Sequence, residues 1–130
     1  MIVIDTSAIV AILFEELEAA RFRLILSGAT DIRMSAVTDY ETRLITVHRR
    51  GPLLIEGYEE LVANGGISIA TFDQVQSSFA FSAYRRYGKG NHPARLNFAD
   101  CAAYALAKSL DAPLLFKGDD FIQTDVRIAK

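Results

Sequence analysis

Short apolar runs that alternate with longer segments of helical character constrain the fold of this chain more than any other feature. Ile2–Ile4 opens the chain with three consecutive β-branched residues, a pattern typical of a strand buried on both faces of a parallel sheet. Strands that alternate with helices favour parallel pairing through right-handed crossovers. We therefore predict a three-layer α/β/α fold with a mostly parallel central sheet of about five strands. The runs lie at 2–4, 32–34, 67–70, 113–116 and, as a possible last strand, 126–128.

Capping residues and helix breakers mark the segments between these runs. Ser35 is placed to cap a helix that ends at Gly51, and Asn97 is placed to cap another. Thr71, followed by Gln74 three residues later, matches a capping box. The predicted helices are two short ones within 6–27, then 35–50, 53–63, a helix from 72 or 73 to 87, and 98–110.

Length and composition limit the class of protein. A chain of 130 residues with 51% hydrophobic residues suits a single domain spanning 1–130 that needs no disulfide. The single cysteine, Cys101, lies among alanines, so we expect a buried small side chain in a reducing, cytoplasmic protein. The start has no basic signal-peptide region, and no run of about 20 apolar residues occurs, so we expect no membrane span.

Basic residues gather in two segments, although the formal net charge is −2, and the earlier segment holds Arg43, His48, Arg49 and Arg50. No acidic residue lies between Asp73 and Asp100, whereas Arg85, Arg86 and Lys89 fall within that stretch. The net charge argues against broad adhesion to nucleic acid. The stretch is either a solvated helix face or a weak candidate for contact with a polyanion.

Carboxylates recur near the junctions between predicted strands and the helices that follow them. Asp5 closes the first strand, Glu41 lies in the second turn of a helix, Asp100 lies in a first turn, and Asp119 follows a strand. Each has a structural explanation by itself: a helix cap for Asp5, a favourable helix dipole for Asp100, an ion pair for Glu41, and a turn for Asp119 with Asp120. Sites in such folds form at the carboxyl ends of strands. We therefore expect the acids to converge there.

Converging carboxylates favour a hard divalent cation. They repel one another unless their pKa values rise or a cation neutralises them, and oxygen ligands select Mg²⁺ or Mn²⁺ over zinc. The chain has only two histidines, His48 and His92, far apart in the sequence, and no glycine-rich phosphate-binding motif. A metal held in this way suits the hydrolysis of phosphate esters.

Four stretches of the chain, taken together, resemble the PIN-domain family, in particular VapC-type toxins of bacterial toxin–antitoxin modules. They are MIVIDTSAIVAIL, SAVTDYETRLI, YRRYGKGNHPARLNFADCAAYALA and PLLFKGDDF. The resemblance runs nearly end to end. It implies endonucleolytic hydrolysis of RNA with one or two Mg²⁺ or Mn²⁺ ions.

The same resemblance assigns roles to individual residues. Asp5, Glu41 and Asp100 match the three firmest acids of the family, and Asp119 matches the more variable fourth, with Asp120 as the alternative. Supporting roles at the metal site fall to the side chains of Thr6, Ser7 and Asn97.

Three positions depart from the family pattern. Asp39 and Tyr40 stand where relatives more often have apolar residues, and Lys117 stands where many PIN domains carry threonine. Lys117 could pair with an acid or with a phosphate, and we do not interpret it as a loss of activity.

The resemblance also implies partners. These are an RNA substrate, a homodimer, and a VapB-like antitoxin whose C-terminal segment lies across the acidic groove, with promoter DNA bound only through the antitoxin complex. Candidate dimer surfaces are Leu53–Leu61 or the first two helices with Phe14, Leu17 and Phe22. Two other functions stay open: a DNA-associated binding module with an idle pocket, and a metal-dependent DNase or phosphatase.

Overall fold

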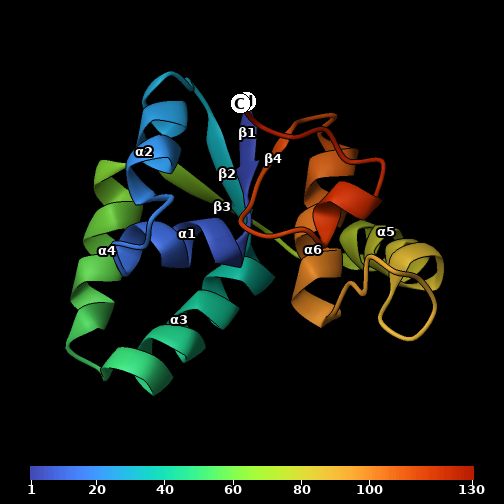
Figure 1. The fold of residues 1–130 in the computed structure, drawn as a ribbon, viewed down its shortest axis with the longest axis horizontal. Coiled ribbons are helices and arrows are strands. Elements are labelled where there is room, and N and C mark those ends of the chain that lie inside the picture. Colours follow the sequence, from blue (N-terminus) through green and yellow to red (C-terminus); the bar gives the residue numbers. More distant parts are fainter.

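A computed structural model describes all residues, 1–130, as a parallel sheet between two layers of helices (Figure 1). The strands pair in the order β3-β2-β1-β4, and every pairing is parallel. The non-sequential order places β1, the first strand, in the interior of the sheet. The predicted α/β class and three layers are therefore confirmed. The strands are β1 (Ile2–Ile4), β2 (Ile32–Ser35), β3 (Ile67–Ala70) and β4 (Leu114–Leu115).

The sheet has four strands, so the prediction of about five is wrong. The segment 126–128 forms only an isolated bridge, in which Ile128 pairs with Leu114. Leu114 donates to the Arg127 carbonyl at 2.8 Å, and Ala129 donates to the Leu114 carbonyl at 2.9 Å. Because β4 is itself only two residues long, it offers the tail too little edge for a ladder.

The predicted helices all form, with ends within a few residues of the expected ones. Ser35 caps α3 and Asn97 caps α6, as their positions in the sequence indicated. The helices are α1 (Thr6–Leu13), α2 (Ala19–Ser27), α3 (Ala36–Arg50), α4 (Leu54–Asn64), α5 (Gln74–Tyr87) and α6 (Phe98–Ser109), followed by a 3₁₀ turn, η1 (Phe121–Gln123).

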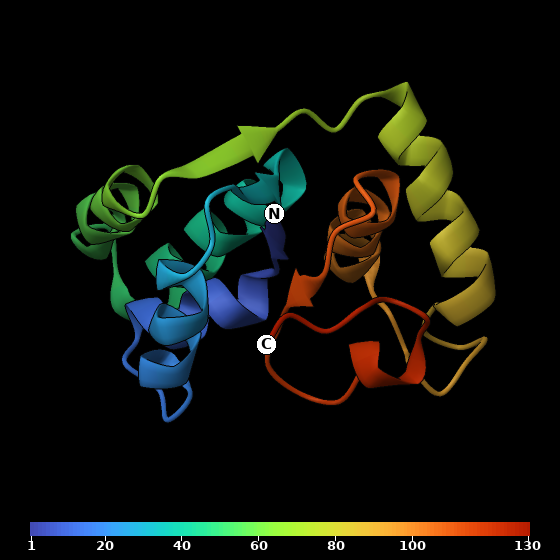
Figure 2. The ribbon, with the colours of Figure 1, turned by 90° about the horizontal axis from the view of Figure 1, so that it is seen from above.

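The cap of α5 differs from the prediction. The Asp73 side chain caps this helix by accepting from the Gln76 amide at 3.0 Å, so the capping box expected at Thr71 and Gln74 is wrong. After β3 the chain crosses over the edge of the sheet to reach the other helical layer (Figure 2). Residues 71–73 make this crossing, and the helix begins only after it.

Alternation along the strands divides the core between the two layers. Val3 and Leu114 join a cluster with α5 and α6, whereas Ile4 and Leu115 join a cluster with α1, α2 and α4. Successive side chains of a strand point to opposite faces, so a strand covered by helices on both sides must be apolar throughout. This explains why the first strand shows a continuous apolar run.

Several side chains follow or depart from their predicted exposure. Cys101 is buried and unpaired, as expected. Phe22 is fully buried in the core, so the prediction that it contributes to a dimer surface is wrong, whereas Leu17 and Leu53 are almost fully exposed. No helix combines the length and the apolar character that crossing a membrane would require.

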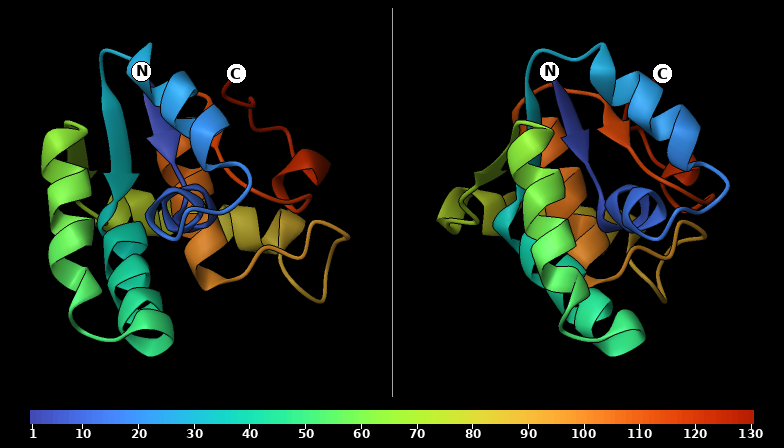
Figure 3. Two further views of the ribbon diagram at one scale, coloured as in Figure 1. Left: turned by 60° about the vertical axis from the view of Figure 1, so that its left-hand side comes forward. Right: turned by 90° about the vertical axis from the view of Figure 1, so that its left-hand side faces the viewer.

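The fold brings several chain segments to one end of the sheet. β1 and β2 run side by side, and both lead into helices, α1 and α3, at their carboxyl ends (Figure 3). The N-terminal end of α6 approaches the same region, since α6 packs against α3. Residues at these three helix starts can therefore face one another.

Candidate active site

A pocket of about 440 Å³ opens where α1, α3, α6 and the segment after β4 meet. Three of the four predicted acids line it, together with all three predicted supporting residues. The pocket also takes in side chains that the sequence did not point to. Its lining consists of Asp5, Thr6, Ser7, Val10, Glu16, Glu41, Ile45, Arg49, Asn97, Asp100, Lys117 and Gly118.

Asp5 uses one carboxylate oxygen to cap α1 and leaves the other without a partner. Its Oδ2 accepts from the Ser7 amide at 3.0 Å and from the Ser7 hydroxyl at 2.7 Å. Its Oδ1 is buried and has no hydrogen-bond partner. Burial raises the pKa of Asp5 to about 6, and the nearby charge of Glu41 adds to the rise. Asp5 thus caps α1 with one oxygen and leaves the other available to a ligand.

Asp100 is held in the same manner at the start of α6. Its Oδ2 accepts from the Asn97 amide at 3.0 Å, and the Asn97 Oδ1 accepts from the Asp100 amide at 2.9 Å, forming a reciprocal capping box. Burial raises the pKa of Asp100 to about 7, and the charges of Asp5, Glu41 and Asp120 raise it further. Two acids in one pocket therefore both resist ionisation in the absence of a cation.

The two candidates for the fourth acid, Asp119 and Asp120, lie in the segment after β4. Gly118 adopts φ of +99°, which favours glycine, and this turn borders the pocket. Asp119 and Asp120 are both exposed and neither lines the pocket. The charge of Asp120 nevertheless contributes to the raised pKa of Asp100. The sequence favoured Asp119, and it could not distinguish adjacent acids in a turn.

Lys117 and Glu16, which lies between α1 and α2, close one side of the pocket. The Lys117 Nζ lies 2.9 Å from Glu16 Oε1 and 3.3 Å from Glu18 Oε2, and the Lys117 amide donates to the Ser7 hydroxyl at 2.9 Å. Lys117 thus pairs with acids, one of the two partners its sequence position left open. Nothing in the local sequence pointed to Glu16.

Arg49 is the second basic residue of the pocket; the sequence placed it in a basic segment but not at the site. It lies on α3, eight residues after Glu41, with Ile45 midway between them. Residues four apart share a helix face, so this spacing was a signal that sequence inspection could have used.

The basic residues that we predicted to contact RNA lie elsewhere. Arg85, Arg86 and Lys89 do not line the acidic pocket. Arg86 pairs with Asp125 at 3.7 Å, and α5, which carries both arginines, packs on the outer side of α6 (Figure 2). Their role in binding stays a prediction, but the structure gives them no place at the acids.

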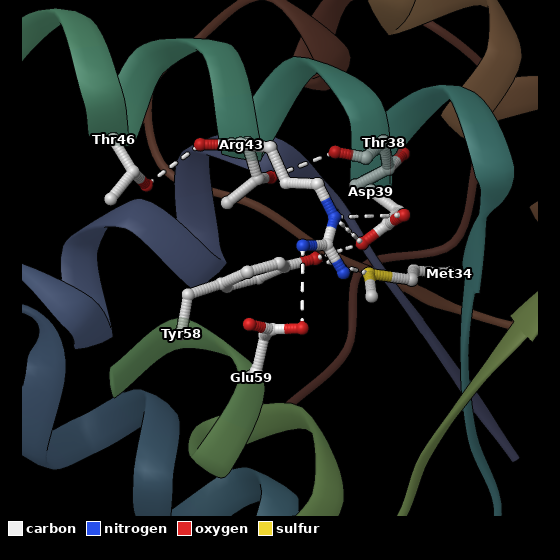
Figure 4. Close-up of polar contacts among 8 residues, drawn as sticks. Met34, Thr38, Asp39, Arg43, Thr46, Tyr58 and Glu59 are labelled. Atoms are coloured by element: carbon white, nitrogen blue, oxygen red, sulfur yellow. Dashed lines mark hydrogen bonds and ion pairs between the residues drawn. The ribbon is translucent and has the colours of Figure 1, made fainter. Parts of the chain in front are cut away.

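A different face of α3 carries a closed polar network (Figure 4). The buried Tyr58 hydroxyl donates to Asp39 Oδ1 at 2.7 Å, and the Arg43 Nε lies 3.2 Å from the same oxygen. Arg43 also lies 3.6 Å from Glu59 on α4. The departure at Asp39 from the family pattern therefore has a structural explanation, because Asp39 joins α3 to α4.

The pocket's donor set fits a hard divalent cation. Asp5 Oδ1 and Thr6 Oγ1 are both buried without a hydrogen-bond partner, and the lining contains no histidine or cysteine. No three Asp, Glu, His or Cys side chains lie close enough together to hold an ion by themselves. Mg²⁺ does not require such a cage, because it commonly binds through one or two carboxylates and retains several waters. The residues present therefore suit Mg²⁺ or Mn²⁺ better than zinc.

Comparison with known proteins agrees with this geometry. The PIN domain family matches residues 2–127. A VapC ribonuclease of Mycobacterium bovis and ribonuclease VapC42 of Mycobacterium tuberculosis are each 42% identical over 98% of both chains. Ribonuclease VapC28 of Mycobacterium tuberculosis is 38% identical over 98% of this chain and 96% of its own.

Solved structures show the same fold. The crystal structure of Mycobacterium tuberculosis VapC20, described as a sarcin–ricin loop cleaving toxin, superposes with a TM-score of 0.80 at 15% identity, covering 97% of this chain and 96% of that one. FitAcB from Neisseria gonorrhoeae gives 0.68 at 20% identity, covering 100% and 97%. From its matched family, its relatives and its fold, this chain belongs to the PIN-domain family, among the VapC-type ribonucleases.

Proposed function

We propose that this protein is a Mg²⁺- or Mn²⁺-dependent endoribonuclease that acts as the toxin of a toxin–antitoxin pair. PIN-domain ribonucleases generally depend on a divalent metal, and the relatives reported above are named ribonucleases. One observation carries the proposal: a buried Asp5 oxygen without a partner lies in the same pocket as Asp100, which also has a raised pKa. A cation would satisfy both carboxylates.

In this proposal the acids divide the work at the metal. Asp5 and Asp100 hold the ion directly, and their capping bonds to Ser7 and Asn97 fix the orientation of each carboxylate. Glu41 acts directly or through a bound water from the facing wall on α3. The fourth acid is Asp119 or Asp120, and the effect of Asp120 on the pKa of Asp100 supports Asp120.

The chain's own residues prepare the pocket for a phosphodiester. When bound, the metal lowers the pKa of a water and stabilises charge on the phosphoryl and leaving oxygens. Asp5 and Asp100 are held in position by backbone and side-chain hydrogen bonds at the starts of two helices, so they need little reorganisation before reaction. Thr6 adds a buried hydroxyl with no other partner.

The partners follow from the relatives. An antitoxin is the expected partner of a VapC-type protein, and one structure with the same fold is a toxin–antitoxin complex from Klebsiella pneumoniae. We propose that the antitoxin is VapB-like, that it covers the acidic pocket, and that the protein forms a homodimer. We also propose a cytoplasmic location, in keeping with the single, unpaired cysteine.

The test uses purified protein, free of its partner, with RNA, DNA and a small phosphate ester offered side by side. Of the three substrates, we expect the protein to cut only RNA. The reaction should require Mg²⁺ or Mn²⁺, and EDTA should stop it. Thermal unfolding gives a second readout: a bound ion at about 100 times its Kd stabilises the folded state by about 2.7 kcal/mol. Cleavage in EDTA, or metal stabilisation that survives Asp5→Asn, would contradict the proposal.

A further inference from the structure

We propose that Arg49 binds a phosphate of the RNA backbone that flanks the cleaved bond. The inference rests on the proposed ribonuclease function and assigns a subsite within it. It moves the substrate path from the basic stretch around Arg85 and Arg86 to the seam between α1 and α3.

The pocket lies between two facing helices, α1 and α3. Thr6 and Val10 lie one turn apart on α1, and Glu41, Ile45 and Arg49 lie on successive turns of α3. All five line the same pocket. Because residues four apart share a helix face, the pocket follows the α1–α3 seam from the acids to Arg49.

The pocket contains more negative than positive side chains. Asp5, Glu16, Glu41 and Asp100 place four carboxylates around a volume that must admit a polyanion. The pocket's other cation, Lys117, is already paired with Glu16 and Glu18.

The Arg49 side chain makes no hydrogen bond, ion pair or aromatic contact in the structure. Its neighbour Arg50, by contrast, lies 4.5 Å from the centre of the Phe14 ring. Arg49 is therefore the cation of this pocket that is free to accept an anionic ligand, and the fork of a guanidinium suits the oxygens of a phosphate.

The length of α3 indicates which phosphate it contacts. Eight residues at 1.5 Å per residue separate Glu41 and Arg49 by roughly 12 Å along the helix axis. Successive nucleotides of a stacked strand rise by about 3.4 Å, and an extended strand rises by more. Because its place on the helix lies away from that of Glu41, we place the phosphate bound by Arg49 beside the cleaved bond and not at it.

The experiment measures RNA binding separately from cleavage. Binding of a fluorescent RNA oligonucleotide is followed by anisotropy in Mg²⁺ at several salt concentrations, in an Asp100→Asn background that prevents turnover. Arg49→Gln, Arg49→Lys and Arg85→Gln are compared. Arg85 is a matched control, because it is an exposed arginine in the last turn of a helix but lies outside the pocket.

We expect Arg49→Gln to weaken binding by about tenfold, the size of one charge-assisted hydrogen bond. It should also reduce the slope of log K against log salt by about 0.7, the value for one phosphate contact on a single strand. Arg49→Lys keeps the charge and should keep the slope, and Arg85→Gln should change neither quantity. In the otherwise unmodified protein, Arg49→Gln should raise KM with little change in kcat.

Two results would overturn the inference. A folded Arg49→Gln protein with an unchanged slope and affinity would remove Arg49 from the RNA path, and a reduced slope in Arg85→Gln would place that path along α5. Either result leaves the ribonuclease assignment intact if the unmodified protein still cuts RNA. A protein that neither binds nor cuts RNA would overturn the proposed function and this subsite with it.

Discussion

Two faces of one helix, α3, differ in whether their charged side chains are paired. On the face toward α4, Asp39 accepts from Tyr58 and Arg43, and Arg43 also reaches Glu59 (Figure 4). On the face toward the pocket, Glu41 lies near enough to Asp5 for its charge to raise the pKa of Asp5, and the Arg49 side chain pairs with no other residue. The first set is closed on itself, whereas the second is open.

The difference separates charges that hold the fold from charges that await a ligand. A buried polar group without a partner costs free energy, and the unpaired oxygens of Asp5 and Thr6 lie in one pocket with further acids, which indicates a candidate ligand site. A paired network stabilises the contact between two helices and needs nothing further. The comparison predicts that variants on the two faces affect activity and stability in opposite ways.

The largest expected effect is the loss of cleavage in Asp5→Asn. This change keeps the shape and the cap acceptor but removes the charge that a cation needs, so the rate of RNA cleavage should fall by about 10³-fold or more. Initial rates with purified protein measure it. A protein that retains wild-type rates after this change would end the contrast between the two faces.

The next effect concerns pH and the metal-free protein. The folded pKa of Asp100, about 7, lies above its ordinary value of 3.8, so the folded state binds more protons than the unfolded state between these values. The stability of the metal-free protein should therefore fall as pH rises from about 4 to 7.

Asp100→Asn removes that carboxyl group and tests this linkage. It should stabilise the metal-free protein at pH 8 by about 3 kcal/mol and flatten part of the pH profile, the part due to Asp5 remaining. Urea unfolding in EDTA across this range gives the result. Equal pH profiles for the two proteins would show that Asp100 does not carry the penalty.

A smaller, opposite effect is expected on the closed face. Asp39→Ala leaves the buried Tyr58 hydroxyl and Arg43 without their acceptor, which should lower the free energy of unfolding by about 2 kcal/mol. Cleavage per folded molecule should stay within about twofold of the unmodified protein, since Asp39 lies outside the pocket. Stability should be measured together with activity. If cleavage is lost in protein that is still folded, the two faces are not independent.

The smallest effect belongs to Tyr58→Phe. It removes one hydrogen bond but leaves Asp39 paired with Arg43, so a loss of about 1 kcal/mol is expected. The ring remains to fill the core. Thermal unfolding at fixed pH detects a change of this size, and an unchanged midpoint would mean that the Arg43 pair alone maintains the contact.

Much of the fold could be predicted because its signals are local. The run at Ile2–Ile4, the cap at Ser35 and the capping box at Asn97 and Asp100 each depend on residues within one turn or one strand. The fifth strand and the Thr71 cap were wrong for the opposite reason. Both depended on how long a neighbouring strand is and on where the chain crosses the sheet.

The candidate site divides in the same way. Three acids could be predicted to meet because the carboxyl ends of parallel strands share one edge, whatever the details of packing. The contribution of Asp120 to the electrostatics of Asp100 and the pairing of Lys117 with Glu16 could not be predicted. They depend on contacts between segments that are remote in the chain.

By itself, the sequence determined the alternation of strands and helices, the helix caps, and the acids at strand ends, since neighbouring residues set backbone conformation and capping. Only the tertiary structure decided which charges are paired and which are left open. That choice depends on burial and on distances between side chains from separate elements, and the same acid can cap a helix with one oxygen while offering the other to a ligand.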